Sequence, residues 1–364
     1  MRIYQIIEHL ESVAPVHYQE SYDNAGLIVG DKTAEISVAL ITLDVTEEVI
    51  DEAILTGCGL IISHHPLIFK GIRHITGSNE VERCLIKAIQ NNIAIYSAHT
   101  NLDSITGGVN TKICEKLGLT KCRILSPAKN QLLKLITYVP EDHLAIVRSA
   151  LFSAGAGVIG NYDQCSYSAS GAGTFRGNEE SNPFVGLKGE LHTEKEYRLE
   201  TILPRHLAGN VVAALSGSHP YEEVAYDLVP LENEFSSVGA GMIGELAEPV
   251  DETRFLLTIK QIFGCKMIKH TALLNRKISS VAVCGGSGSF LIPKAMAEGA
   301  DLFVTADIKY HDFFDTGKKI VLADIGHYES EQFTKEVLKE IVSKKFPTFA
   351  LRLSDVKTNP VSYL

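Results

Sequence analysis

Short apolar runs alternate with amphipathic segments in the first third of the chain. Residues 38–43, 60–62 and 93–98 have the pattern of buried strands, while residues 46–55 and 81–90 have the apolar spacing of helices. Strands that alternate with helices predict a parallel sheet covered by helices. We therefore expect an α/β lobe at the start of the chain.

The same alternation returns in the last third of the chain. Strands are expected at residues 280–284, 302–305 and 320–323, and helices at residues 290–298 and 330–345. The two parts look like a loose internal duplication, which favours two similar α/β lobes.

The middle of the chain has a different pattern, with more polar and aromatic strand material. The expected order of elements is β-α-β-β-α-β, which is the ferredoxin-like pattern. A glycine-rich turn at Gly171, Gly173 and Gly177 separates the second strand from the third. The expected strands lie at residues 133–139, 158–170, 197–203 and 223–230, and the expected helices at residues 141–154 and 205–215.

Together these patterns predict an α/β fold in three parts. An N-terminal α/β lobe spans residues 1–130, a ferredoxin-like α+β domain is inserted at residues 131–233, and a C-terminal α/β lobe spans residues 234–364. The polar residues near 126–130 and 232–237 are interpreted as linkers.

Composition narrows the functional classes. The 364 residues carry a formal net charge of −10 without a basic stripe, which disfavours a nucleic-acid partner. No apolar run reaches the ~18 residues of a membrane span, and the amphipathic start, residues 1–15, does not resemble a signal peptide. Seven cysteines without a CxxC pair indicate reduced thiols. We therefore expect a cytoplasmic protein with no membrane partner.

The most informative local feature is a pair of histidines, His64 and His65, at the end of an apolar strand. Imidazole is the commonest protein metal ligand, and open α/β sheets build their sites at the carboxyl ends of strands. Neighbouring strand residues point to opposite faces, so the two imidazoles are not expected to share one ion unless the chain turns between them. We expect them to serve two ions, or one ion and one supporting contact. A chance pair of loop histidines is the alternative.

Two further strand ends carry potential ligands. His99 and Asp103 follow the strand at 93–98, and His327 and Glu331 follow the strand at 320–323. The last two are four residues apart and share a helix face, where Glu331 could bridge two ions through its two oxygens. Taken singly, His99 could be a loop histidine, Asp103 could cap a helix near Val109, and Glu331 could only favour a helix dipole.

The weaker candidates are polar groups beside these strand ends. Residues 285–289, with the sequence GGSGS, could present N–H groups to an anion, but a tight structural turn is favoured. Asp23 with Asn24 suggests an Asx turn or a substrate contact, and Asp44 suggests a neighbour of a helix N-cap. Asp307, within a polar group at residues 307–311, could support the site or lie on a solvated helix start.

In combination, five strings along the chain resemble the GTP cyclohydrolase 1 type 2 homologue family, also known as NGG-interacting-factor-like dinuclear metal-centre proteins. The resemblance covers the whole chain, and the motifs occur in the family's order. The strings are Tyr22-Asp23-Asn24-Ala25-Gly26-Leu27, Ser63-His64-His65-Pro66, His99-Thr100-Asn101-Leu102-Asp103, Thr305-Ala306-Asp307-Ile308-Lys309-Tyr310-His311 and Gly326-His327-Tyr328-Glu329-Ser330-Glu331.

The resemblance implies a site for two divalent ions and a toroidal homohexamer whose metals face the central cavity. Zinc, iron and manganese all suit mixed imidazole and carboxylate ligands, so the identity of the metal stays open. The ligands that the resemblance implies are His64, His65, Asp103, His327 and Glu331.

A second resemblance concerns the middle of the chain. The string His219-Pro220-Tyr221-Glu222-Glu223-Val224-Ala225-Tyr226-Asp227 is similar to the signature of the PII-like or CutA-like domain of longer bacterial family members. Such domains tend to trimerise, which implies a sensing or gating role or an oligomerisation lid, and no metal ligands.

A two-ion centre suggests hydrolysis by a metal-bridging water, with a nucleotide or phosphoester as the small-molecule substrate. His99 or His311 could orient this water or carry its proton. The alternative is a non-enzymatic metal-binding or regulatory assembly. An open coordination position would favour catalysis, and full closure by protein ligands would favour a structural role.

Overall fold

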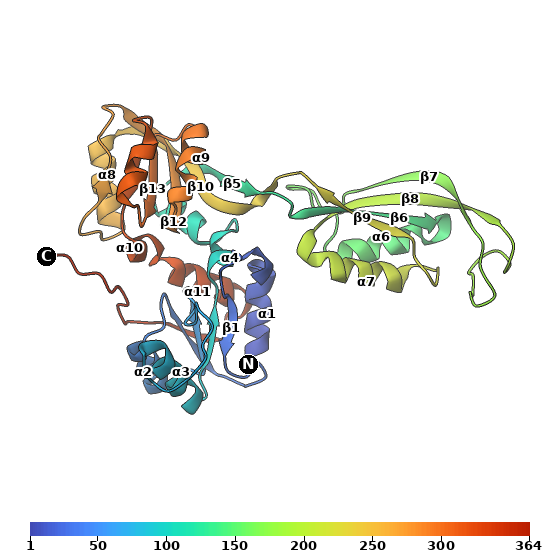
Figure 1. Ribbon diagram of the computed structural model, residues 1–364, viewed down its shortest axis with the longest axis horizontal. Coiled ribbons are helices and arrows are strands. Elements are labelled where there is room, and N and C mark those ends of the chain that lie inside the picture. Colours follow the sequence, from blue (N-terminus) through green and yellow to red (C-terminus); the bar gives the residue numbers. More distant parts are fainter. The chain divides into compact units, whose positions relative to one another are not determined.

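The computed structural model describes residues 1–364 and divides into two compact units (Figure 1). One unit combines residues 1–126 with residues 237–364, and the other comprises residues 127–236. No helix is long and apolar enough to cross a membrane.

The first unit contains a five-stranded sheet in the order β1-β4-β3-β2-β15. Strands β15, β2, β3 and β4 run parallel, whereas the edge strand β1 pairs antiparallel with β4. Helices α2 (Glu47–Leu55) and α3 (Glu80–Gln90) pack on one face, and α11 (Thr334–Lys345) packs on β2 and β15. The strands are β1 (Gly26–Val29), β2 (Val38–Thr42), β3 (Leu60–Ser63), β4 (Ala94–Ser97) and β15 (Ala350–Leu353).

The apolar runs form these strands because both faces of the sheet are covered. Leu40, Ile61 and Ile95 belong to the core beneath α2 and α3, while their neighbours along each strand are buried on the opposite face. Strand register aligns Thr42 with Ser63 and Ser63 with Ser97. The carboxyl ends of these three strands therefore reach the same edge of the sheet.

The second sheet of this unit has the order β11-β14-β13-β12-β10-β5. Strands β12, β13 and β14 are parallel, and β10 and β11 pair antiparallel with their neighbours β12 and β14. The strands are β5 (Thr120–Ala128), β10 (Phe235–Asp251), β11 (Lys269–His270), β12 (Lys277–Ser287), β13 (Leu302–Ala306) and β14 (Val321–Asp324).

Short helices connect the strands of the first unit. Besides α2, α3 and α11, the α-helices of this unit are α1 (Ile3–Val13), α4 (Thr100–Asp103), α5 (Val109–Lys116), α8 (Glu252–Ile262), α9 (Ile292–Ala297) and α10 (His327–Glu331). The 3-10 helices are η1 (Val16–Tyr18), η4 (Ser289–Leu291) and η5 (Tyr310–Thr316).

The second unit is a four-stranded antiparallel sheet in the order β7-β8-β6-β9. Val147 and Leu151 of α6 and Val211 and Leu215 of α7 form a core with one face of this sheet. The elements are β6 (Leu132–Pro140), η2 (Glu141–His143), α6 (Leu144–Ser153), β7 (Ser166–Phe175), β8 (His192–Pro204), η3 (Arg205–Leu207), α7 (Ala208–Ser218) and β9 (Tyr226–Leu231).

Three local predictions are wrong. The second strand of the inserted part is β7, at 166–175 rather than 158–170, so Gly171 and Gly173 lie in a strand and not in a turn. A Cβ at Gly173 would lie 2.1 Å from Glu196 Oε2 on the neighbouring strand β8, so a larger residue here would displace this carboxylate. The helix expected at 330–345 is broken into α10 and α11. The boundaries between the two units fall within the two expected linkers, although part of each linker belongs to β5 or β10.

Candidate metal centre

The histidine pair lies just beyond the end of β3. The backbone N–H groups of His64 and His65 both donate to the Leu43 carbonyl, at 3.2 and 2.9 Å, so the chain turns between the strand and the pair. Their ring centroids are 4.9 Å apart and both imidazoles reach the same site. The expectation that they point to opposite faces is therefore wrong, because the strand ends at Ser63.

The second sheet supplies its ligand candidates through α10. His327 and Glu331 contact each other across one helical turn, as their spacing predicts, with His327 Nε2 3.0 Å from Glu331 Oε2. Gly286 of β12 lies against this carboxylate, and a Cβ built there would be 2.3 Å from Glu331 Oε1. The φ of +62° at Gly286 and this close approach both favour glycine at this position.

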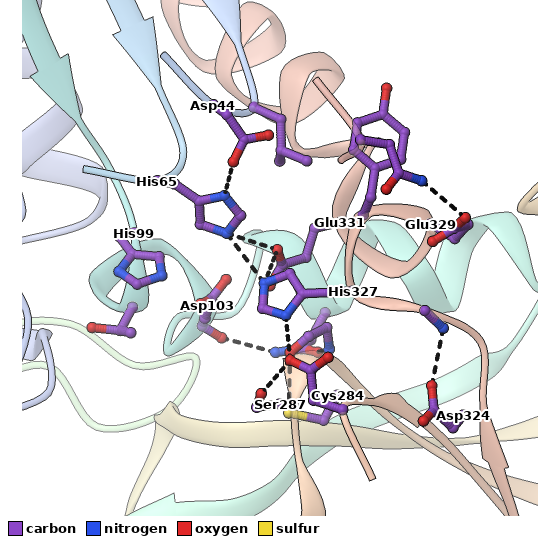
Figure 2. Close-up of a pocket in the computed structure, with 18 of the residues that line it drawn as sticks. Asp44, His65, His99, Asp103, Cys284, Ser287, Asp324, His327, Glu329 and Glu331 are labelled. Atoms are coloured by element: carbon purple, nitrogen blue, oxygen red, sulfur yellow. Dashed lines mark hydrogen bonds and ion pairs between the residues drawn. The ribbon is translucent and has the colours of Figure 1, made fainter. Parts of the chain in front are cut away.

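Glu331 lies at the centre of two groups of potential ligands. His65 and His327 place Nε2 3.0 Å from its Oε2 atom, while His64 Nε2 lies 3.7 Å from its Oε1 atom. Asp103 joins the second group, with Oδ1 3.6 Å from His64 Nε2. Figure 2 shows His65 and His327 converging on Glu331 and on each other. The structure thus brings together all five predicted ligands from three strand ends.

The Nδ1 atom of each imidazole is held by an oxygen acceptor. The acceptors are three carboxylates and one backbone carbonyl, whose oxygens lie between 2.6 and 2.8 Å from Nδ1. The Nε2 atom of each ring therefore remains available for a ligand. This arrangement fixes the tautomer and orientation that histidine has when it binds a metal. The pairs are His64 with Ala98 O, His65 with Asp44 Oδ1, His99 with Asp23 Oδ1, and His327 with Asp307 Oδ2.

The supporting carboxylates are themselves anchored. Asp44 Oδ2 accepts from Thr358 Oγ1 at 2.5 Å, and Asp307 Oδ2 also accepts from Ser287 Oγ at 2.6 Å. Asp307 has a φ angle of +55°, a left-handed conformation that costs about 1 kcal/mol for a residue other than glycine. Here that conformation accompanies the contact between its side chain and His327.

Several buried polar atoms in this site have no hydrogen-bond partner. They include His64 Nε2 and Asp103 Oδ1. Buried polar groups are nearly always paired, because an unmade hydrogen bond costs about 1–3 kcal/mol. Nitrogen and carboxylate lone pairs that converge without donors between them are what a bound cation would satisfy, so the residues fit a metal.

The acidic residues of the centre differ in their affinity for protons. Burial, reinforced by the negative charge of Glu331, raises the pKa of Asp103 well above its usual range. Burial would also raise the pKa of Glu331, but the imidazoles of His327, His64 and His65 lower it well below its usual value. Glu331 therefore holds its charge more readily than Asp103, and Asp103 gains a proton more easily.

The histidines of the centre also differ in their pKa values. Burial lowers the pKa of His64. Burial acts in the same direction on His65 and His327, but contacts with carboxylates outweigh it and raise their pKa values to about 10 and about 9. In the absence of an ion, protons on His65 and His327 would balance the charge of Glu331.

The two proton-carrier candidates are placed differently. His99 lines the cavity of the site and lies near His64 and His65, with ring centroids 5.2 and 5.3 Å away. His311 lies in η5, which places its exposed side chain against Tyr310 and Phe314 and outside the residues that line the cavity, and its role stays a prediction. Burial opposes ionisation of Asp23, but hydrogen bonds from His99 and Thr100 lower its pKa to about 2.

Several simpler interpretations are also corrected. Asp103 does not cap the next helix, since α5 has Gly108 as its N-cap. Thr46 caps α2, and Asp44 instead holds His65. Asp307, for which a supporting role was one of two predictions, holds His327. The sequence did not predict the roles of Asp23 and Asp44 behind the histidines, although each lies beside a strand.

A cavity of about 940 Å³ opens onto the centre. Its wall includes His65, His99, Asp103, His327 and Glu331. Because the side chain of His327 is 40% exposed while that of His64 is fully buried, the two ligand groups differ in their access to the cavity.

The fold and site define an α/β protein with a candidate metal centre formed by residues from two sheets. A sequence model of the Duf34/NIF3 (NGG1p interacting factor 3) family matches residues 1–360. The chain therefore belongs to the Duf34/NIF3 family, in agreement with the resemblance seen in its motifs.

Curated relatives and a solved structure support this membership. Proteins named GTP cyclohydrolase 1 type 2 homolog from Halalkalibacterium halodurans and Bacillus subtilis are 39% and 38% identical to the chain, each covering 99% of it and 98% of the relative. The crystal structure of a Bacillus cereus protein related to NIF3 superposes with a TM-score of 0.86 at 38% identity, covering 100% of this chain and 99% of the other.

Proposed function

We propose that this protein is a metal-dependent hydrolase with two divalent ions at the candidate centre. His65 and His327 would hold one ion with Glu331 Oε2, and His64 and Asp103 the other with Glu331 Oε1. The observation that carries this proposal is the position of Glu331, whose two carboxylate oxygens each face a separate group of nitrogen and oxygen donors.

A pair of bound divalent ions acidifies water and stabilises negative charge that develops on an attacked carbon or phosphorus. The protein's own part is to hold the five ligands and to manage protons. His99 is the candidate for the second task, since its Nδ1 is held by Asp23 and its ring faces the cavity. Asp23 would stabilise the charged imidazole after His99 takes a proton.

Access to the centre favours hydrolysis over a purely structural or regulatory metal site. The group around His327 opens onto a cavity large enough for a small molecule, whereas a structural metal site is closed by its protein ligands. A nucleotide or phosphoester is the proposed substrate class, in keeping with the name of the relatives. Zinc, iron and manganese all suit the donor set.

We also propose a toroidal homohexamer and a PII-like or CutA-like identity for residues 127–236. The support for the second is its strand order β7-β8-β6-β9 with two helices on one face, which is the ferredoxin-like arrangement. Light scattering coupled to size-exclusion chromatography tests the hexamer, and a monomer or dimer at micromolar concentration would contradict it.

The ligand assignment is tested by Glu331→Gln with Glu329→Gln as its matched control. Both residues are buried glutamates on α10 that line the cavity, but only Glu331 belongs to the ligand groups. We expect Glu331→Gln to lose most of its metal by elemental analysis and to reduce hydrolysis at least about 100-fold, because it removes one charge and one bridging oxygen.

Glu329→Gln should keep the wild-type metal content and fold. Equal metal content in wild type and Glu331→Gln would contradict the assignment. Hydrolysis itself is tested by screening nucleotides and phosphoesters with added manganese, zinc, iron or magnesium, followed by mass spectrometry. No turnover by fully loaded wild type would favour the non-enzymatic alternative.

A further inference from the structure

The wall of the cavity at the candidate centre is rich in acid and poor in base. It includes seven aspartate or glutamate side chains, one lysine and no arginine. The lysine, Lys269, is already paired, with Nζ 2.6 Å from the buried Asp324 carboxylate. Glu20 and Glu329 add negative charge beyond the carboxylates that hold the histidines or the proposed ions.

Two bound divalent ions would not make the net charge of the cavity wall positive. Together with Lys269 they would supply five positive charges against the seven carboxylates of the wall. Sites for triphosphates usually add lysine, arginine or a cradle of backbone N–H groups to the charge of a metal. No arginine lines the cavity, and its one lysine is already paired.

The glycine-rich loop at residues 285–289 was the one candidate for such a cradle. Two of its backbone donors are in use, since Gly285 N donates to Asn110 Oδ1 at 2.9 Å and Gly286 N donates to Ser330 Oγ at 3.0 Å. The loop instead lets β12 approach Glu331. The two glycines that would open a phosphate cradle therefore have their N–H groups directed to side chains of the protein.

Aromatic side chains stand on the same wall. Tyr22, Phe69 and Phe290 line the cavity although they are 70%, 53% and 64% exposed. Phe69 also contacts the His99 ring edge-on, with centroids 5.6 Å apart. Exposed aromatic faces beside a catalytic cavity are suited to stacking on a flat ring.

From these observations we infer that the site selects a substrate with a flat aromatic body and at most one phosphate group. Nucleosides, nucleoside monophosphates and aryl phosphomonoesters fit this description, and nucleoside triphosphates do not. The inference rests on the proposed hydrolase function and narrows its substrate class.

The test compares binding of guanosine, GMP and GTP to the metal-loaded protein by equilibrium dialysis at a fixed free Mn²⁺ concentration. We expect GMP to bind at least about tenfold more tightly than GTP, a difference of about 1.4 kcal/mol. Glu20→Lys should narrow this difference at least about threefold, because it reverses one charge on the wall.

The aromatic part is tested by Phe69→Ala. Loss of one stacking face should weaken the binding of GMP and of guanosine by about tenfold each. This change lies within the range measured for base stacking on an aromatic side chain. The control is Phe184→Ala, which removes a similarly exposed phenylalanine from the other unit and should leave binding unchanged.

Three results would overturn the inference. These are GTP binding as tight as GMP binding, unchanged binding by Phe69→Ala, and no binding of any of the three probes by wild type that carries two ions per chain. The proposed function fails by a separate measurement, namely wild type that holds no metal or Glu331→Gln that keeps it.

Discussion

The orientation of His65 depends on a residue far away in the sequence. Thr358 donates to Asp44 Oδ2, and Asp44 Oδ1 accepts from His65 Nδ1 at 2.7 Å. The hydroxyl thus prevents the carboxylate from rotating away from the imidazole. Residues that hold a metal-binding histidine in this way typically contribute 10–100-fold to metal affinity.

We therefore expect Thr358→Val to weaken binding of the divalent ion about tenfold, because it leaves one oxygen of a partly buried carboxylate without its donor. Competition with a fluorescent chelator measures this change. Thr358→Ser retains the hydroxyl and should restore the affinity. Equal affinities for the valine and serine variants would show that the contact does not orient His65.

Protonation of His65 and His327 gives a second prediction. Burial lowers their pKa values, but contacts with Glu331, Asp44 and Asp307 raise them to about 10 and about 9, so both rings carry protons at pH 7.5 when no ion is bound. Metal binding requires neutral imidazole and should release roughly two protons from these two rings at pH 7.5, in addition to any proton that Asp103 carries.

Calorimetry in buffers with different ionisation enthalpies counts these protons. The apparent metal affinity should rise between pH 7 and pH 9 and level off above pH 10, as protons stop competing. The stability of the metal-free protein should change in the opposite direction and fall as the pH rises. Its raised histidine pKa values contribute stability below about pH 6.5 that is lost as the pH passes 9 to 10. No proton release at pH 7.5 would contradict the assigned charge states.

The close contact between β12 and α10 allows the position of the Glu331 carboxylate to be tested by a substitution on the neighbouring strand. Gly286 has a φ of +62°, and a Cβ there would be 2.3 Å from Glu331 Oε1. Since the colliding atom is the end of a side chain, Gly286→Ala should push the carboxylate away rather than unfold the strand. We expect a metal affinity at least about tenfold lower, together with a loss of about 1 kcal/mol of stability from backbone strain.

Gly57→Ala is the matched control for this substitution. Gly57 has a similar φ of +67°, but a Cβ there would have no neighbour within 4 Å. Both variants should show a similar fall in melting temperature, and only Gly286→Ala should lose metal. If the two variants lost metal equally, strain and not the collision with Glu331 would be the cause.

The sequence predicts which segments form strands and helices better than it predicts which side chains these elements bring into contact. Apolar runs identify β3 and its polar end at His64 because those residues are buried on both faces of a parallel sheet. The strand β10 was missed because its glycine-containing sequence lacks strict alternation. The role of Asp44 could not be predicted, since it depends on which imidazole lies opposite, and that is set by packing.

At the scale of the molecule, the two predicted lobes exchange strands. β15, from the last residues of the chain, pairs with β2 in the first sheet, while β5, from before residue 130, lies at the edge of the second. Neither lobe is complete without the other part of the chain. We therefore expect residues 1–126 and 237–364 to unfold as one cooperative unit.

The inserted unit should be dispensable for the metal centre. All five ligand candidates lie in the first unit, and residues 127–236 are joined to it through the neighbouring strands β5 and β10. Replacing residues 127–236 by a short Gly-Ser linker costs little loop entropy because these strands are already adjacent. The shortened protein should keep its metal content and its cooperative melting transition, measured by elemental analysis and calorimetry.

The same deletion carrying Glu331→Gln provides the control, since it should lose metal as the full chain does. Loss of metal from the deletion alone would mean that the inserted unit supports the centre. If metal is kept but the assembly measured by light scattering becomes smaller, the inserted unit acts in oligomerisation. The ions then depend only on the strand-exchanged unit, in which His64 and Glu331 come from opposite ends of the chain.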